Sequence, residues 1–332
     1  MKLIYLILLT LLISCGEDND SDIDEVVVLN IPDYFPQYTI PEDNKLTPDR
    51  IKLGEKIFNS NLLSKNNSMS CASCHLSDVA FANNLKTRAG VFDRPGTRNV
   101  PSIFNVIFQE RFLREGSVPT LEQQALVPVQ EHNEFDNDWE TILERLNSET
   151  EFRDLLDKSK YIFPADNKLI TEFNVYAVIR PLAAYQRTLL SVNSKYDKHI
   201  QNKINLTSSE LLGKKLFKSD SLNCSKCHSG VLFSDYNFYN NGLYESYKDV
   251  GRNRFTLDPT DIGKFKVPSL RNVEITYPYM HDGSVASLEE VISHYENGGY
   301  NHPNKSPLIK GFKLSQVEKV ALIDFLKTLT EL

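Results

Sequence analysis

The sequence predicts an all-α protein with two tandem domains and long loops between the helices. Three observations support this class. A helical pattern of apolar residues occurs twice, each copy precedes the same type of cysteine-containing pentapeptide, and strand signals are weak throughout. Thr47 and Thr207 stand where the two helices would begin, and Pro48 suits the first helical position. A second amphipathic pattern closes each copy, over residues 175–190 and 317–329.

These markers divide the chain, whose 332 residues are enough for two or three domains with cores of their own. A polar stretch without apolar periodicity, residues 195–205, marks the boundary between the two copies. The net charge of -7 argues against non-specific nucleic-acid binding. The predicted segments are a leader (1–14), an acidic tether and linker (15–45), a first domain (46–200) and a second domain (201–332).

The N-terminal segment has the pattern of a bacterial export signal. Lys2 precedes an apolar stretch at residues 3–13, and the residues up to Cys15 resemble a lipobox. We expect cleavage before Cys15 and lipid attachment to it, which would anchor the protein to a membrane of the cell envelope. A plain signal peptide with an incidental cysteine is the alternative. The acidic residues 16–26 would form a disordered tether.

Two Cys-x-x-Cys-His pentapeptides carry the chemistry of this chain. Their spacing is typical of c-type haem attachment, in which two thioethers hold the porphyrin and the histidine is the proximal iron ligand. Zinc half-sites or redox dithiols are the alternatives, but a dithiol needs no histidine after each pair, and zinc favours paired spacings. The sequence therefore predicts two haem c groups in two cytochrome c-like domains. The six residues are Cys71, Cys74, His75, Cys224, Cys227 and His228.

Further blocks accompany the pentapeptides at residues 98–105, 115–128, 267–273 and 278–291. Together they resemble the bacterial di-haem cytochrome c peroxidase family, including its MauG-type branch, over about residues 46–330. The resemblance implies reduction of hydrogen peroxide to water with electrons from a small donor, a cytochrome c or copper protein. Peroxide would react at the haem on His75, and electrons would enter through the haem on His228. A peroxidatic iron needs an open coordination position, whereas an electron-transfer iron favours two protein ligands.

The resemblance places Gln124, Pro128 and Glu134 in the peroxide pocket. Glu134 would act as the acid/base that moves a proton between the peroxide oxygens, and Gln124 would donate a hydrogen bond. Taken alone, residues 131–134 would suggest a solvated surface carboxylate, because exposed Glu is the common case. The spacing from Gln124 through Pro128 favours the pocket.

The chain departs from the family pattern at two places. Relatives carry a histidine in the loop after the first pentapeptide, but none lies between His75 and Arg98, so we expect an open first haem. His132 could approach that haem instead, or lie on the surface. Relatives also carry a tryptophan between the haems where this chain has Arg114, so electron transfer must run differently or more weakly. The only tryptophan, Trp139, does not align with that position.

Two residues are candidates for the distal ligand of the second haem, Tyr295 and Met280. A methionine ligand raises the reduction potential, whereas a tyrosinate favours the ferric state, and core packing would explain either residue. The resemblance favours Tyr295 and implies that His281 packs near this haem without ligating it.

The resemblance also implies a calcium ion between the haems. Its ligands would be oxygens of Asn99, Thr276 and Pro278, which suit a hard cation. A homodimer is a further expectation, since relatives often dimerise. Two other functions stay open: a MauG-type oxidase acting on a protein or organic substrate, and a non-catalytic electron-transfer cytochrome.

Overall fold

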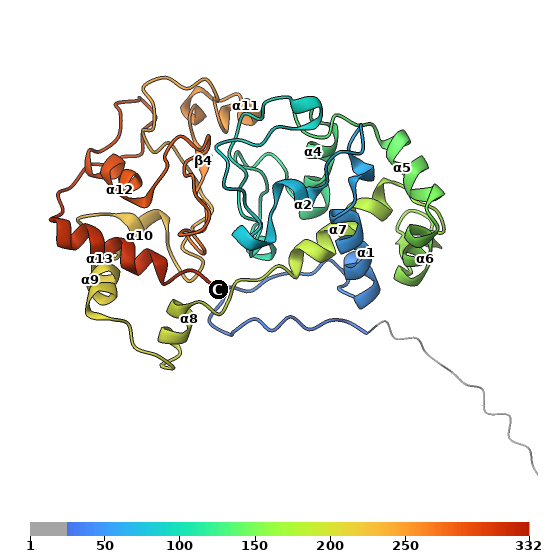
Figure 1. The fold of residues 1–332 in the computed structure, drawn as a ribbon, viewed down its shortest axis with the longest axis horizontal. Helices are drawn as coiled ribbons and strands as arrows, with labels where there is room; N and C mark the ends of the chain where they lie inside the picture. The colour runs from blue at the N-terminus through green and yellow to red at the C-terminus, as the bar shows by residue number, and fades with distance from the viewer. Residues whose placement is uncertain (1–24, 332) are drawn as a thin grey trace, which may run out of the picture.

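The structure is a computed structural model that describes residues 25–331, and its regular secondary structure is almost entirely helical (Figure 1). Cys15 and residues 1–24 as a whole lie outside the described residues. The predicted helical class is confirmed. The α-helices are α1 (Pro48–Phe58), α2 (Cys71–Cys74), α3 (Leu121–Gln124), α4 (Leu126–Gln130), α5 (Trp139–Ser148), α6 (Thr150–Ser159), α7 (Val175–Arg187), α8 (Lys195–Ile200), α9 (Ser208–Phe217), α10 (Cys224–Cys227), α11 (Asn253–Thr256), α12 (Leu288–Glu296) and α13 (Gln316–Lys327).

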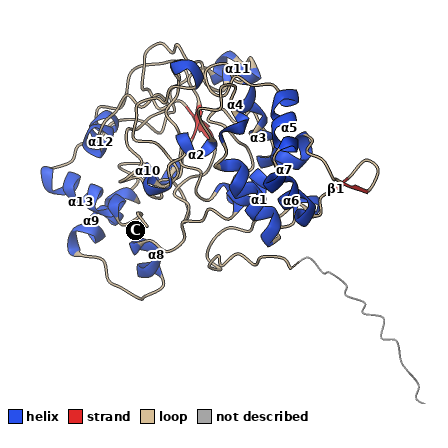
Figure 2. Ribbon diagram, turned by 45° about the vertical axis from the view of Figure 1, so that its right-hand side comes forward, coloured by secondary structure: helices blue, strands red, loops and turns tan. Residues whose placement is uncertain are grey.

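Strands are few and short, as the weak strand signal predicts. β1 (Ile162–Phe163) pairs antiparallel with β2 (Lys168–Leu169), and β3 (Phe238–Tyr239) pairs antiparallel with β4 (Phe265–Lys266). Long loops make up most of the remaining chain (Figure 2). Short 3₁₀ turns interrupt these loops at Glu42–Asn44, Asn61–Leu63, Ser77–Val79, Val91–Asp93, Val106–Phe108 and Pro259–Asp261. Within the described residues, no helix combines the length and the apolar character needed to cross a membrane.

Threonine caps begin the first helix of each repeat, as the sequence predicts. Thr47 accepts a hydrogen bond from the backbone N–H of Arg50, and Pro48 occupies the first turn of α1. Thr207 caps α9 in the same way, and Glu210 bonds back to the Thr207 backbone N–H at 2.7 Å. Such caps satisfy N–H groups that the first helical turn leaves without partners.

Each repeat is built on one close helix crossing. α1 packs against α7, and α9 packs against α13. A glycine stands at each crossing: a Cβ on Gly54 would lie 1.9 Å from the carbonyl oxygen of Pro181, and one on Gly213 would lie 1.9 Å from that of Ala321. Only glycine allows the two backbones to approach so closely. The helix pairs of the two repeats therefore pack in the same way.

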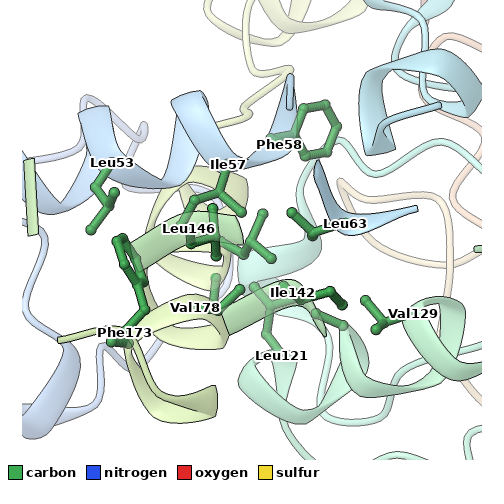
Figure 3. Packing of buried hydrophobic residues seen from close by; sticks show 14 of the residues in the cluster. Leu53, Ile57, Phe58, Leu63, Leu121, Val129, Ile142, Leu146, Phe173 and Val178 are labelled. Atoms are coloured by element: carbon green, nitrogen blue, oxygen red, sulfur yellow. The ribbon is translucent and has the colours of Figure 1, made fainter. Parts of the chain in front are cut away.

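Two apolar cores lie under these crossings. The first contains buried residues between 53 and 189, and Figure 3 shows Leu53 and Ile57 of α1 gathered with Leu146 of α5 and Val178 of α7. The second contains buried residues between 196 and 329 and includes Tyr196 of α8. The domain boundary at residue 200 stays a prediction.

Residues 26–45 form a strap that contacts both halves of the chain. The ring of Phe35 is buried and lies under the Arg271 guanidinium, 4.7 Å from its carbon. Further along the strap, Asn44 is buried and donates to Glu122 at 2.9 Å. In Figure 1 this blue segment runs beneath the first half and turns back near α8, where Tyr34 bonds to Asp197. The strap therefore connects the two halves from outside.

Candidate haem and peroxide site

One cavity of about 1160 Å³ reaches both pentapeptides. Its volume exceeds the roughly 300–1,000 Å³ of ordinary small-molecule pockets. All four cysteines and both histidines of the pentapeptides line it, together with residues from both halves of the chain. The cavity therefore suits large groups attached at each pentapeptide.

The two pentapeptides have the same local geometry. Each Cys-x-x-Cys forms a single helical turn, α2 or α10, and the following histidine ends it. The Nδ1 of His75 lies 2.8 Å from the Phe81 carbonyl oxygen, and that of His228 lies 3.0 Å from the Phe233 carbonyl oxygen. A carbonyl only accepts, so Nδ1 carries the proton and Nε2 keeps its lone pair. That is the tautomer and orientation an iron ligand requires.

The cysteine environment disfavours the redox-dithiol alternative. Burial raises the pKa of Cys71 and of Cys224 to about 12, and the pKa of their partners Cys74 and Cys227 to about 11. Redox cysteines depend on a thiolate, which a lowered pKa provides. The zinc alternative finds no support either, because residues 25–331 contain no group of three or more His, Cys, Asp or Glu placed to hold a metal ion.

The residues assigned to the peroxide pocket lie along the same cavity as His75. Gln124 of α3, Pro128 of α4 and Glu134 all line it. A tight turn positions Glu134, whose N–H bonds to the Glu131 carbonyl at 2.9 Å and whose carbonyl accepts from Val91 at 2.9 Å. Glu134 is exposed, as the surface alternative predicts, and it also lines the cavity. Desolvation by the neighbouring residues, followed by the nearby Glu131 charge, raises the pKa of Glu134 to about 7.

His132 and Trp139 lie away from this cavity. His132 is exposed, and its Nδ1 lies 3.1 Å from Arg94 and 3.3 Å from Asp136, within a surface ion cluster. Trp139 begins α5 and packs against the edge of the first core. The surface alternative for His132 is confirmed.

Both candidate distal ligands of the second haem lie on the cavity beside one amide. Asn241 donates from Nδ2 to the Met280 sulfur at 3.2 Å and also bonds to the Tyr295 hydroxyl. Burial raises the pKa of Tyr295 to about 12. His281 is buried and stacks on Phe265, with ring centroids 4.0 Å apart and planes 14° apart. The choice between Tyr295 and Met280 stays a prediction.

Comparisons with known proteins agree with this geometry. The family model for di-haem cytochrome c peroxidase matches residues 48–205. The methylamine utilization protein MauG of Methylorubrum extorquens is 31% identical over 292 residues, which cover 87% of this chain and 80% of that protein. The chain belongs to the di-haem cytochrome c peroxidase family. Membership in this family implies haem c cofactors.

Two further relatives match over most of their length. The cytochrome-c peroxidase IdrP1 of a Pseudomonas species is 32% identical, with 89% of this chain and 84% of that protein covered. A crystal structure of a MauG-like protein associated with microbial copper homeostasis is 32% identical, with a TM-score of 0.85 and coverage of 92% and 96%. The relatives thus include both peroxidases and MauG proteins, and the family alone does not separate the two activities.

A charged side chain already occupies the expected calcium position. Asn99, Thr276 and Pro278 all line the cavity. Arg114 donates to the Asn99 carbonyl oxygen at 2.8 Å and to its Oδ1 at 3.0 Å. Burial lowers the pKa of Arg114 to about 10, so the guanidinium is charged at neutral pH. The oxygens of Asn99 already bind a cationic group, and the donor set does not fit a calcium ion.

Sequence reasoning missed a third element of the internal repeat. Residues 100–129 and 267–296 align without a gap, and both contain Val-Pro-Ser-x-x-Asn-Val and Gly-Ser-Val. Their folds correspond: Phe112 bridges to Val118, and Tyr279 bridges to Val285. The shared Val-Pro-Ser spacing was the signal that could have revealed the repeat. It makes Pro128 the counterpart of Tyr295.

Proposed function

We propose that this protein is a di-haem c-type peroxidase that reduces hydrogen peroxide to water. One peroxide takes up two electrons and two protons to give two waters. Peroxide reacts at the haem on His75, and electrons from a small cytochrome or copper protein enter through the haem on His228. Cys71 and Cys74 would hold the first haem, and Cys224 and Cys227 the second. The observation that carries the proposal is the Glu134 carboxyl, which lines the same cavity as His75 and has its pKa raised to about 7.

The residues of the pocket handle the protons of this reaction. When bound, the haem supplies an iron that exchanges electrons with peroxide. Glu134 accepts a proton from the peroxide oxygen nearer the iron and returns it to the far oxygen, which leaves as water. A carboxyl with a pKa near the working pH serves both steps. Gln124 donates a hydrogen bond that orients the peroxide.

The repeat supports different roles for the two haems. Tyr295 lies in α12 and lines the cavity that His228 also lines, so its phenol oxygen could serve as a ligand of the second haem, whereas its counterpart in the first repeat is Pro128. A proline side chain has no atom that can bind iron. The loop after the first pentapeptide adds no histidine between His75 and Arg98. We therefore propose that the first haem keeps an open side for peroxide and that Tyr295 closes the second, with Met280 as the rival ligand.

The test is peroxide-dependent oxidation of a reduced cytochrome c by the purified di-haem protein. Glu134→Gln keeps the shape of the side chain and removes the base, so the rate should fall about 10²- to 10⁴-fold. Glu140→Gln is the control, because Glu140 is exposed at the start of α5 and does not line the cavity. Equal rates for Glu134→Gln and the parent protein would favour a non-catalytic electron-transfer cytochrome.

A MauG-type oxidase is the second candidate function. The similarity to MauG and the tyrosine at position 295 favour it. Such an enzyme would use the two oxidising equivalents of peroxide on a protein or organic substrate. Fast turnover with reduced cytochrome supports the peroxidase, whereas slow turnover with long-lived oxidising equivalents after peroxide addition supports the oxidase.

We also propose that the protein is located in the bacterial cell envelope. Residues 1–14 would be removed, and Cys15 would carry the lipid that anchors the protein to a membrane. A homodimer stays a prediction from the family.

A further inference from the structure

We propose that the guanidinium of Arg114 takes the place of a calcium ion between the two halves of this protein, so that the fold needs no calcium. The inference concerns stability and metal content. It does not depend on the proposed peroxidase activity.

The contacts of Arg114 are those of a bound cation. Its Nη2 donates to the Asn99 carbonyl oxygen at 2.8 Å and to Asn99 Oδ1 at 3.0 Å, while its Nε donates to the same carbonyl at 3.1 Å. Asn99 is buried, so its oxygens cannot turn to water instead. Calcium prefers such amide and carbonyl oxygens. The guanidinium satisfies both of them with charge-assisted hydrogen bonds.

The second half of the molecule contains a corresponding arrangement, in which a side-chain nitrogen also binds oxygens. The repeat makes Lys266 the counterpart of Asn99, and Arg114 the counterpart of His281. Matching backbone bonds confirm this pairing, because Asn99 N–H bonds to His281 O at 2.9 Å and Lys266 N–H bonds to Arg114 O at 2.7 Å.

The side chain of Lys266 fills the corresponding place in that half. Its Nζ donates to Gln109 Oε1 at 2.5 Å and to the Arg111 carbonyl at 2.7 Å. Gln109 and Arg111 are the counterparts of Thr276 and Pro278, the other residues expected to bind calcium. In each half, therefore, a side-chain nitrogen donates to oxygens of residues expected to bind calcium, or of their counterparts in the repeat.

Charged groups surround Arg114. Burial and the nearby Arg98 charge lower its pKa to about 10, and the carboxylates of Asp282, Asp249 and Glu115 oppose this and favour its charged form. Glu115 and Asp249 also pair with Arg98, which ties the first half of the chain to the second. A calcium ion beside Asn99 would meet the guanidinium at hydrogen-bond distance from the same oxygens, and the two positive charges would repel each other.

The test measures calcium content and thermal unfolding of the di-haem protein. After exposure to calcium and gel filtration, the parent protein should retain none, and a chelator should leave its Tm unchanged. Arg114→Ala frees the Asn99 oxygens, so it should bind about one calcium per chain. Without calcium, its Tm should fall by about 3–6 °C, and calcium should restore part of this loss.

Two further variants make the test specific. Arg114→Trp restores the residue that relatives carry and should also acquire calcium binding. Arg111→Ala removes a nearby guanidinium whose contact is the Gly116 carbonyl, so it should acquire none. Stoichiometric calcium in the parent protein, removed by chelator with a fall in Tm, would overturn the proposal even if the variants did not fold. Folded Arg114 variants that bind no calcium would also overturn it.

Discussion

Gly54 of α1 faces the carbonyl oxygen of Pro181 in α7 with no room for a side chain. A Cβ would lie 1.9 Å from that oxygen and 2.8 Å from the Tyr185 Cβ. Gly54→Ala must therefore push the helices apart, and we expect a loss of about 3 kcal/mol in the free energy of unfolding. Urea unfolding followed by circular dichroism measures it. Gly230→Ala is the control, since nothing lies within 4 Å of its Cβ position and only its φ of +64° is strained.

Arg271 and Asp197 form a buried two-pronged ion pair beneath the strap. The two bonds are each 2.8 Å, and the side chains are 2% and 0% exposed. Asp197→Asn leaves the Arg271 charge without its partner, so unfolding should become easier by about 3–5 kcal/mol. The exposed pair of Lys56 and Glu151 provides the control, because Glu151→Gln should cost less than about 1 kcal/mol.

The same ion pair predicts how acid affects stability. Burial alone would raise the pKa of Asp197, but the hydrogen bonds and charge of Arg271 outweigh it and lower the pKa. A carboxyl with a lowered folded-state pKa stabilises the fold above its unfolded pKa of about 3.9. This stabilisation is lost as the pH falls through the folded-state pKa. In acid titrations of the free energy of unfolding, Asp197→Asn should lack the loss of stability that Asp197 protonation causes. An unchanged acid transition in this variant would contradict the role given to Asp197.

Glu134 should control the pH dependence of peroxide reduction. Its pKa is raised to about 7, so the carboxylate that accepts the proton is lost as the pH falls below that value. The rate should therefore fall about tenfold for each pH unit below 7. Initial rates with saturating reduced cytochrome test this. The inflection near pH 7 in the plot of rate against pH should be absent in Glu134→Gln. If the inflection persists in that variant, another group is responsible for it.

The distal ligand of the second haem can be identified by two substitutions. Tyr295→Phe removes the phenol oxygen, and we expect it to change the ferric absorption and electron paramagnetic resonance spectra of that haem. Met280→Leu should leave these spectra largely intact, since the proposed ligand of that haem is Tyr295. The opposite pattern would make Met280 the ligand. Haem content measured after each substitution separates loss of a ligand from loss of the cofactor.

Local signals in the sequence predicted the helices and the pentapeptides because short-range chemistry decides them. Thr47 and Thr207 cap helices by bonds to residues three positions away, and the periodic apolar residues identify α1 and α9. The histidines followed from motif spacing alone. The Phe81 and Phe233 carbonyls that orient them come from loop conformations that no local pattern reveals.

Contacts between distant loops account for what the sequence could not predict. Arg114 was visible in the sequence, but its bonds to Asn99 depend on how two loops meet. The strap was expected to be a linker, yet Phe35 packs under Arg271, more than two hundred positions along the chain. The pairing of Pro128 with Tyr295 was present in the sequence and needed only a comparison of the chain with itself.

The shared cavity bears on how such a protein can be recombined. Residues of both halves line it. A chimera that joins the amino-terminal half of this chain to the carboxyl-terminal half of a relative would therefore combine lining residues from two different proteins in one cavity. The two halves are thus expected to evolve as a matched pair, although they repeat one sequence pattern.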